Sequence, residues 1–246
     1  MDTYDVIIVG SGAGGGMASK ILSESGLSVA VVEAGSDFDP AMEEYRTQLR
    51  FPWESPRRGA NTVRAFGDFD AAYGGWEIDG EPYTRKDGTE FDWFRSRMVG
   101  GRTNHWGRIS LRFGPDDFKR RSIDGLGDDW PIGYEDVKPF YDRVDKIVGV
   151  FGSKEGMRNE PDGNFLPPPK PRLHEAAFTK AGKKINLPVI PSRVSVLTRP
   201  VNNERGACFF CAQCNRGCQV YGDFSAGTVL VKPAIKTGNV DLYTYA

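Results

Sequence analysis

Five glycines fall between residues 10 and 16, directly after the apolar run Tyr4–Val9. A short β-branched run of this kind is typical of a strand that is buried on both faces of a parallel sheet. Within the glycine run, Gly10, Gly12 and Gly15 fit the pattern G-x-G-x-x-G. The first glycine permits a tight turn, the second lets the backbone approach a diphosphate, and the third lets a helix pack closely on the strand.

A helix and a second strand are predicted to follow this turn. Residues 17–25 have a helical pattern, and Gly26 is placed to end the helix in a left-handed conformation. Residues 27–32 are again apolar and lead to Glu33, which is placed to accept hydrogen bonds from ribose hydroxyls. We therefore predict an α/β fold with a Rossmann-like dinucleotide-binding βαβ unit, with phosphate at the helix N-terminus. The residues predicted to contact the dinucleotide are Gly10, Gly12, Ala13, Gly14, Gly15, Glu33, Ala34 and Gly35.

A second glycine-rich segment lies at residues 97–107 and reads RMVGGRTNHWG. Its two adjacent glycines again allow a backbone to approach a flat ligand closely. Together with the βαβ unit, this segment resembles the glucose–methanol–choline (GMC) flavoprotein oxidoreductases, and most closely their sugar-oxidising branch. The resemblance implies FAD as the dinucleotide, with its isoalloxazine ring lying along the segment. The residues so implied are Gly100, Gly101, Thr103, Asn104, His105, Trp106 and Gly107.

The resemblance also bears on the two histidines of the chain, His105 and His174. In the similar pyranose oxidases, the histidine of the Gly-Gly segment is covalently bonded to the flavin, and the corresponding residue here is His105. The same motif also occurs where the flavin is not covalently held, so both alternatives stay open. Hydride transfer from an alcohol needs a base for the hydroxyl proton. In the family that base is a histidine of the C-terminal half, and no catalytic base is predicted in this chain.

All four cysteines lie within eleven residues, with the spacing C-x2-C-x2-C-x3-C at Cys208, Cys211, Cys214 and Cys218. This spacing is typical of the cysteine run of bacterial iron–sulfur ferredoxins. Structural zinc more commonly uses two separated pairs of ligands, and disulfides between such close neighbours would be strained. We predict an iron–sulfur cluster, with zinc, disulfides and unmodified thiols as the alternatives.

A cysteine cluster is also what the resemblance implies for one bacterial subgroup of the family. Its sugar and sugar-acid dehydrogenases are similar in passing flavin electrons through a cluster to a cytochrome c partner, and some are carried to the periplasm by a small accessory subunit. Their cluster is often 3Fe-4S with three cysteine ligands. Both 3Fe-4S and 4Fe-4S therefore stay open here, and no cysteine is singled out as the spare one.

The chain is predicted to interleave two kinds of segment. Residues 1–36, 95–125 and 205–246 are assigned to an FAD-binding domain, and residues 37–94 and 126–204 to lid or substrate-side segments. Because family members continue for about as many residues again, the resemblance implies that this chain is truncated and inactive alone.

Three further stretches carry structural predictions. Residues 128–137 open a helix whose apolar stripe is expected in the core. Residues 161–172 are proline-rich and are predicted to form an extended connection. Residues 229–231 and 240–244 are predicted to be strands. The members of the apolar stripe are Val137, Phe140, Tyr141, Val144 and Ile147.

Composition narrows the remaining function classes. The chain has 32 Lys and Arg residues against 33 Asp and Glu, which gives no general case for binding nucleic acid or an anionic membrane. No apolar run reaches the roughly 18 to 20 residues that span a bilayer. The N-terminus also lacks the basic and apolar regions of a signal peptide. The compartment stays open between the cytoplasm and a periplasm reached by co-export with a partner subunit.

The function predicted for the complete enzyme is FAD-dependent oxidation of a sugar or polyol hydroxyl. Hydride passes to the flavin, and electrons leave through the cluster to a cytochrome-type acceptor. Two alternatives remain. One is a non-catalytic, truncated flavin-binding fragment. The other is an oxygen-using oxidase of the same family whose cysteines hold zinc or stay as free thiols.

Overall fold

The computed structural model describes residues 3–42, 74–75, 84–90, 95–211, 214 and 217–246. The chain forms two compact units. Unit 1 comprises Met1–Gly107 and Phe209–Ala246, and unit 2 comprises Arg108–Cys208. Residues 108–125 thus fall in unit 2, whereas the functional division predicted above assigned them to the FAD-binding domain. That functional division stays a prediction, and most of residues 37–94 lie outside the described residues.

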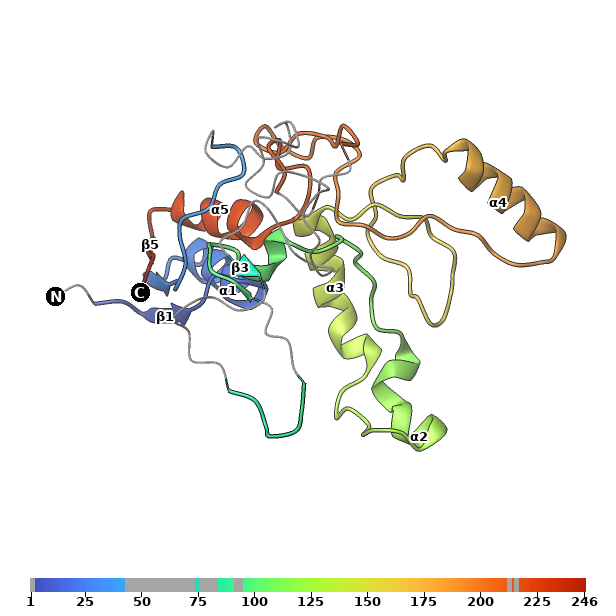
Figure 1. Cartoon of the computed structure of the whole chain (residues 1–246), viewed down its shortest axis with the longest axis horizontal. Helices are drawn as coiled ribbons and strands as arrows, with labels where there is room; N and C mark the ends of the chain where they lie inside the picture. Colours follow the sequence, from blue (N-terminus) through green and yellow to red (C-terminus); the bar gives the residue numbers. More distant parts are fainter. Residues whose placement is uncertain (1–2, 43–73, 76–83, 91–94, 212–213, 215–216) are drawn as a thin grey trace. The chain divides into compact units, whose positions relative to one another are not determined.

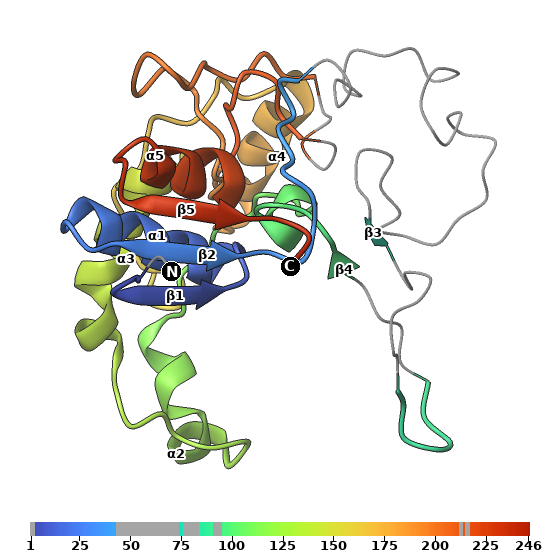
Figure 2. The ribbon, with the colours of Figure 1, turned by 90° about the vertical axis from the view of Figure 1, so that its left-hand side faces the viewer.

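Unit 1 contains a three-stranded parallel sheet in the order β1-β2-β5, which Figure 2 shows with its strands pointing the same way. The strands are β1 (Val6–Val9), β2 (Val29–Val32) and β5 (Val240–Tyr243). Val29 of β2 lies opposite Val6 of β1 and opposite Val240 of β5. The predicted strand–helix–strand unit and the predicted C-terminal strand are therefore confirmed.

Helix α1 (Ala13–Glu24) connects β1 to β2 and begins four residues earlier than predicted. Two glycines of this helix lie where other atoms leave little or no room for a side chain. A Cβ atom built at Gly15 would lie 1.9 Å from the carbonyl oxygen of Gly10, and one at Gly16 would lie 3.2 Å from the Cβ of Ala226. The helix is followed by Gly26, which has a φ of +89° as its predicted role requires.

The core of unit 1 lies between one face of the sheet and the helices. Buried Ile8, Val29, Val31 and Val240 pack with Ala234, and partly buried side chains of α1 complete the cluster. Because side chains alternate along a strand, Ile7 and Val9 point to the opposite face, where they are 68% and 85% exposed. Within the described residues the sheet is thus covered on one face, and the expectation that the first strand is buried on both faces is wrong for these residues.

The predicted strand at residues 229–231 is wrong. These residues belong to η6 (Gly227–Val231), a π-helical turn that continues into α5 (Lys232–Ile235). A short run of β-branched residues cannot by itself be distinguished from a buried helix segment. Packing decides here, because every residue of η6 is buried and η6 lies against α1.

The remaining elements of unit 1 are short. β3 (Gly74–Gly75) pairs with β4 (Arg95–Ser96) in antiparallel fashion. The turn η3 (Gly101–Asn104) is one 3-10 helix in the second glycine segment. Through these elements the segment at residues 97–107 belongs to the same compact unit as the βαβ fold.

Unit 2 is mainly helical and irregular. Its elements are η4 (Pro115–Lys119), α2 (Arg120–Asp124), α3 (Tyr134–Val148) and α4 (Leu173–Lys184), as labelled in Figure 1 where space allows. The N-terminus of α3 is capped by Asp136, whose carboxylate accepts a 2.8 Å hydrogen bond from the N–H of Gly133. Residues 161–172 contain no helix or extended strand, as predicted.

The apolar stripe predicted for α3 is only partly buried. Phe140 is 67% exposed and Val144 is 37% exposed, so for these two the expectation of a core position is wrong. The buried residues of this helix are instead Tyr134, Asp145 and Val148. The charged residue among them, Asp145, forms an ion pair with the buried Arg112, described below.

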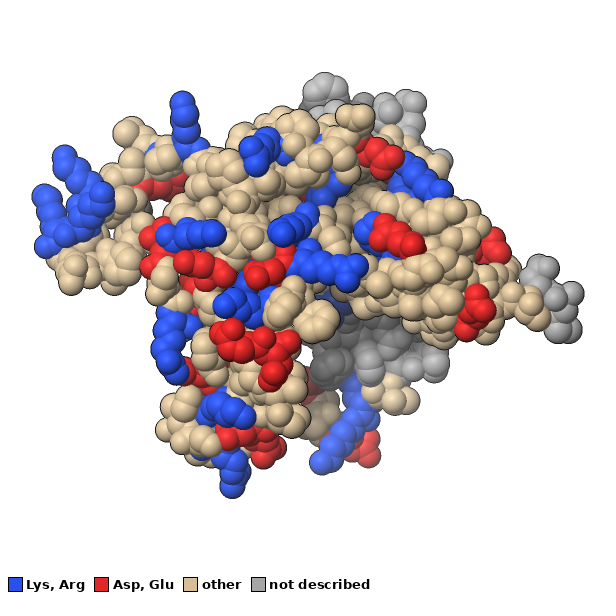
Figure 3. Space-filling model, turned by 180° about the vertical axis from the view of Figure 1, so that it is seen from behind, with Lys and Arg blue, Asp and Glu red and all other residues tan. Residues whose placement is uncertain are grey.

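The hydropathy of the helices and the charges on the surface are both ordinary for this chain. No helix within the described residues is long and apolar enough to cross a membrane. On the face seen in Figure 3, basic and acidic side chains are interspersed, in keeping with the near-zero net charge of the chain.

Candidate dinucleotide-binding site

The turn between β1 and α1 leaves open space in front of the N-terminus of α1. The backbone N–H groups of the first turn of a helix have no partner within the helix. Gly10 has a φ of +86°, which lets the chain reverse directly after β1. Gly12 is the N-cap residue of α1, and no side chain caps this helix. A Cβ atom built at Gly12 or at Gly14 would meet no atom within 4 Å. Such a turn can accept an anion, because the N–H groups and the helix dipole both favour negative charge.

Glu33 lies at the end of β2 and is only 6% exposed. Its Oε2 accepts hydrogen bonds from the backbone N–H of Ser11 at 3.0 Å and from the Ser11 hydroxyl at 2.6 Å. Its Oε1 accepts a 2.9 Å bond from the N–H of Gly35. Among the residues that the structure describes, no Lys or Arg pairs with Glu33. A carboxylate has about four lone-pair positions, so Glu33 can accept roughly one further donor, such as a ribose hydroxyl.

The second glycine segment runs directly against the first turn. Gly100 donates a 3.0 Å hydrogen bond from its N–H to the hydroxyl oxygen of Ser11. A Cβ atom on Gly35 would lie 1.9 Å from the carbonyl carbon of Arg97, and one on Gly101 would lie 3.9 Å from the Cα of Gly12. The two glycine segments predicted from sequence are therefore brought together, and the glycines are what permits the close approach.

Polar side chains of the second segment hold the segment itself in shape. The Asn104 amide donates to the carbonyl oxygens of Val99 and Gly101 at 3.0 and 3.1 Å. The Thr103 hydroxyl accepts a 2.8 Å bond from the N–H of Ala226 and donates to the carbonyl of Gly100. In this structure Thr103 and Asn104 support the turn, while their predicted contact with the cofactor stays a prediction.

His105 and Trp106 follow the turn. His105 is buried, with 7% of its surface exposed. The Trp106 indole donates a 3.2 Å hydrogen bond to the carbonyl of Phe224, and the two rings meet edge to face with centroids 6.1 Å apart. His174, by contrast, is exposed on α4 in unit 2. The structure thus places only the first of the two histidines in the unit that carries the glycine turns.

One residue and one segment of this site, and a cluster of three residues elsewhere in unit 1, were not predicted from the sequence. Ser11 was read as a variable position of the glycine pattern, although it is fully buried and contacts both segments. Residues 224–227 were not singled out, yet a Cβ atom on Gly100 would lie 2.7 Å from the nitrogen of Gly227. The cluster consists of Asp39, Tyr221 and Lys232. No local pattern signals these contacts, because their partners are far apart in the chain.

In the cluster of Asp39, Tyr221 and Lys232, the ammonium of Lys232 contacts the Asp39 carboxylate. The Tyr221 hydroxyl donates to the same carboxylate at 2.8 Å. Burial alone would raise the pKa of Asp39, but hydrogen bonds from Lys232, from the N–H of Ala41 and from Tyr221 hold it below its ordinary value. This cluster ties the segment after β2 to the segment that follows the last cysteine.

The four cysteines are divided between the units. Cys208 ends unit 2, and Cys211, Cys214 and Cys218 belong to unit 1. Within the described residues, no three His, Cys, Asp or Glu side chains are grouped so that they could hold a metal ion. Among the residues that the structure describes, the predicted metal site is therefore not formed, and no disulfide joins Cys208, Cys211, Cys214 or Cys218.

Cys218 nevertheless has a polar setting of its own. It is buried, and the N–H of Gly222 donates to its Sγ at 3.3 Å. Burial raises the pKa of this thiol, and the nearby Asp223 carboxylate adds to the effect. The backbone N–H groups of Val220, Gly222 and Asp223 point at the sulfur and act in the opposite direction. Burial and Asp223 outweigh these donors, so the pKa of the Cys218 thiol stays above its ordinary value.

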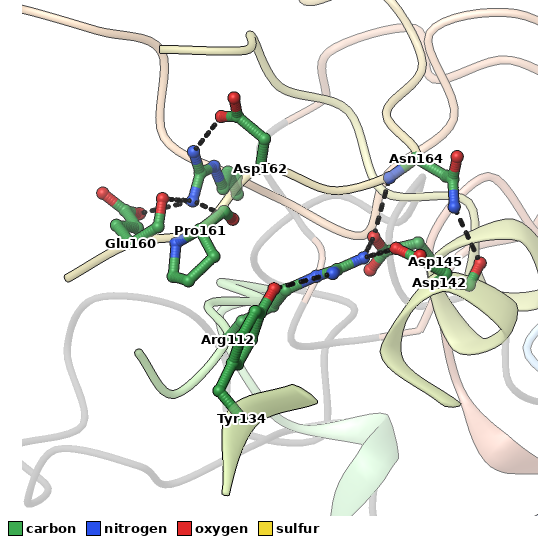
Figure 4. A network of polar contacts seen from close by, with 9 residues as sticks. Arg112, Tyr134, Asp142, Asp145, Glu160, Pro161, Asp162 and Asn164 are labelled. Carbon is green, nitrogen blue, oxygen red and sulfur yellow. Dashed lines mark hydrogen bonds and ion pairs between the residues drawn. The ribbon is translucent and has the colours of Figure 1, made fainter. Parts of the chain in front are cut away.

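Unit 2 contains a separate buried polar network, shown in Figure 4. Arg112 donates to Asp142 at 2.6 Å, to Asp145 at 2.5 Å and to the hydroxyl of Tyr134 at 3.2 Å. Burial alone would lower the pKa of Arg112, but these bonds raise it above the ordinary value. The backbone N–H of Asn164 gives Asp145 a further donor at 3.0 Å.

A second buried guanidinium, that of Arg193, lies in the same unit. It donates to the carbonyl oxygens of Glu160 and Pro161 at 2.6 and 2.9 Å, and to the Asp162 carboxylate at 3.2 Å. It also lies over the ring of Phe165, 4.9 Å from the centroid. These contacts fix the loop at residues 160–165. We interpret both arginines as part of the scaffold, because their acceptors all belong to unit 2.

The fold and the glycine turns together define a class. A parallel βαβ unit, a glycine turn at an uncapped helix start and an acid at the end of the second strand are the parts of a Rossmann-like dinucleotide-binding fold. The solved structure of pyridoxine 4-oxidase from Mesorbium loti matches this fold with a TM-score of 0.50 and 19% sequence identity, covering 99% of this chain and 42% of that one. No family model matches the chain.

Sequence relatives are more specific. Paromamine 6'-oxidase of Streptomyces fradiae is 26% identical over 245 residues, which cover 98% of this chain and 40% of the relative. The fructose dehydrogenase large subunit of Gluconobacter japonicus is 25% identical over 228 residues, covering 83% and 38%. The relatives are flavin oxidoreductases of the GMC type, named as oxidases and dehydrogenases of alcohol or sugar donors.

These findings confirm the resemblance to GMC-type oxidoreductases that the glycine segments carried, but not the iron–sulfur branch. The chain spans about two-fifths of the length of the relatives it matches.

Proposed function

We propose that this chain is the FAD-binding portion of a GMC-type oxidoreductase that oxidises a hydroxyl group of a sugar or polyol. The observation that carries the proposal is the joined pair of glycine turns. One turn offers open space at a helix start, and the other lies directly beside it. A dinucleotide is a ligand that needs both, because its diphosphate and its ring system are recognised at separate places.

The comparisons support the reaction class. The relatives include a paromamine oxidase and a fructose dehydrogenase subunit, whose named substrates both carry hydroxyl groups on a sugar ring. The match extends over nearly the whole chain and includes both glycine segments. A sugar or polyol is therefore the substrate class that we assign to the complete protein.

The residues of the described site have distinct proposed roles. The peptide groups that begin α1 bind the diphosphate, and Glu33 accepts one ribose hydroxyl through its remaining lone pair. Gly100 and Gly101 leave room for a flat ring system, and buried His105 excludes water on that side. When bound, FAD supplies the acceptor for a hydride from the substrate carbon. The base for the hydroxyl proton is not assigned to a residue of this chain.

His105 carries a second part of the proposal, since its ring is buried in the segment that the flavin is proposed to contact. A covalent flavin link and a non-covalent contact remain the two alternatives. Acid precipitation of the protein after FAD binding distinguishes them. Yellow colour that stays with the pellet supports a covalent link, and its loss on His105→Ala assigns the link to this side chain.

We further propose that Cys208, Cys211, Cys214 and Cys218 ligate an iron–sulfur cluster, of the 3Fe-4S or 4Fe-4S type, that relays electrons to a cytochrome-type acceptor. The ferredoxin-like spacing supports this. Within the part of the chain that the structure describes, the thiols are not grouped so that they could hold a metal ion. Iron and sulfide analysis separates this proposal from zinc or free thiols in an oxygen-using oxidase.

The central test is FAD binding by this chain. We expect that added FAD comigrates with the protein in gel filtration and that its fluorescence is quenched on titration. Gly12→Val is the informative variant. A Cβ atom at this position meets no atom of the protein within 4 Å, so folding should be kept, yet the valine side chain occupies the space proposed for the diphosphate. We expect FAD affinity to fall by roughly 100-fold or more, as for loss of a charged group's hydrogen bonds.

The matched control is Gly133→Ala. Gly133 is the N-cap residue of α3, has an extended backbone conformation like Gly12, and lies in unit 2. The two variants should have similar melting temperatures, and Gly133→Ala should bind FAD like the unaltered chain. The proposal is wrong if the unaltered chain stays colourless after gel filtration with excess FAD, or if Gly12→Val binds FAD equally well.

A further inference from the structure

The Ser11 side chain occupies the junction between the two glycine turns. It is fully buried. Its hydroxyl donates to Glu33 Oε2 at 2.6 Å and accepts from the N–H of Gly100 at 3.0 Å. Gly100 lies 89 residues away in the chain, so this hydroxyl connects two segments that no local structure joins.

The two bonds of this hydroxyl act in sequence. The N–H of Gly100 points at Ser11, whose own proton points at the Glu33 carboxylate. A charged acceptor draws the hydroxyl proton toward itself, which makes the oxygen a better acceptor for the next donor. Glu33 is held from its other side by the N–H of Gly35. The result is one continuous chain of hydrogen bonds from the end of β2 to the second glycine turn.

We propose that Ser11 is a positioning residue that holds the turn at residues 100–104 in a fixed place relative to the first glycine turn. The inference rests on the proposed function, because the first turn and Glu33 serve the adenosine diphosphate part of FAD and the second turn serves the flavin part. Ser11 thereby sets the distance between the two parts of the site, while contacting neither the substrate nor the reacting atoms.

The chain supplies a matched control in Ser19. Its hydroxyl is also fully buried, but it donates at 2.8 Å to the carbonyl of Gly16 within the same helix. Ser11→Ala and Ser19→Ala therefore remove the same group from equally buried positions of one unit. Only the first variant removes a bond between the two glycine turns.

The first measurement needs no cofactor. Amide hydrogen exchange at Gly100 is followed by NMR in the unaltered chain and in both variants. Loss of its acceptor should speed exchange at Gly100 by roughly five- to tenfold in Ser11→Ala, the change expected for one hydrogen bond. Glu33→Gln should give a smaller increase, and Ser19→Ala none. Equal exchange at Gly100 in the two serine variants would overturn the inference.

The second measurement compares two probes, FAD and ADP. If Ser11 positions the flavin-side turn, Ser11→Ala should weaken FAD binding about tenfold more than ADP binding, because ADP uses only the first turn. Equal weakening of both probes would show a merely structural role and overturn the positioning role. Failure of the unaltered chain to bind FAD would contradict the proposed function instead, and exchange at Gly100 would still decide whether Ser11 holds the turn.

Discussion

Glu33 in unit 1 and Asp145 in unit 2 are both buried carboxylates, with 6% exposure each, but they are stabilised in different ways. Asp145 accepts from the guanidinium of Arg112 and from the N–H of Asn164. Glu33 accepts only from neutral groups, namely two backbone N–H groups and one hydroxyl. Asp145 thus has a cationic partner, whereas Glu33 has none within the described residues.

This difference indicates which carboxylate serves a ligand. A buried ion pair contributes little net stability, but its charges and lone pairs are used up inside the protein. A carboxylate held by neutral donors retains both its charge and an acceptor position, which a hydroxyl group of a ligand can use. We therefore interpret Asp145 as part of the scaffold and Glu33 as part of the binding site.

The largest expected effect comes from breaking the ion pair of unit 2. Arg112→Met leaves the Asp145 carboxylate buried without its cation, and removing one partner of such a pair typically costs about 3–5 kcal/mol. We expect this loss in the unfolding free energy measured by urea denaturation, without a change in FAD affinity. The control is Arg158→Met, because the side chains of Arg158 and its partner Asp116 are 74% and 42% exposed and exposed pairs contribute little. A similar loss in both variants would contradict the scaffold interpretation of Arg112.

A smaller effect on stability, but a larger one on binding, is expected at Glu33. In Glu33→Gln the amide cannot accept from all three present donors, and losing a bond to a charged group costs about 1.5–3 kcal/mol. FAD affinity should fall as well, since the ribose acceptor is weakened. The comparison variant is Asp145→Asn, which should lower stability and leave FAD titration unchanged. If the two variants affected FAD binding equally, the contrast between the carboxylates would fail.

The smallest expected effect concerns Asp39. Its carboxylate accepts from a cation, Lys232, as Asp145 does from Arg112, and also from neutral donors, as Glu33 does. Its folded pKa is depressed. The stabilisation that ionised Asp39 gives is therefore complete above the pKa of Asp39 in the unfolded chain, roughly 3.9. It is lost as the pH falls through the lower pKa of Asp39 in the folded chain. Asp39→Asn should remove this dependence and cost less than about 1.5 kcal/mol near pH 7. The measurement is the melting temperature of both proteins between about pH 2 and 7, a range that includes the pH at which the stabilisation by Asp39 is lost. A variant with the same acid dependence as the unaltered chain would rule out Asp39 as its source.

Predictions from the sequence are confirmed around residues 6–32, where the relevant residues are neighbours in the chain. The strand, glycine turn, helix and second strand of this stretch were predicted from apolar runs and glycine spacing. The prediction of a strand at residues 229–231 is wrong, because this apolar run without a period is buried as a helix against α1. The prediction of a core position for Phe140 is also wrong, because helical spacing alone does not show which face of α3 is covered by other residues.

By itself, the sequence determined the βαβ unit, the conformation of its first turn and the likeness of both glycine segments to flavin oxidoreductases. Each of these depends on residue types within a few positions of one another, where backbone geometry and side-chain period act directly. Only the tertiary structure decided that Ser11 joins Gly100, and that Lys232 reaches Asp39 across 193 residues. Such contacts leave no period in the sequence, because they arise from packing between elements that are distant in the chain.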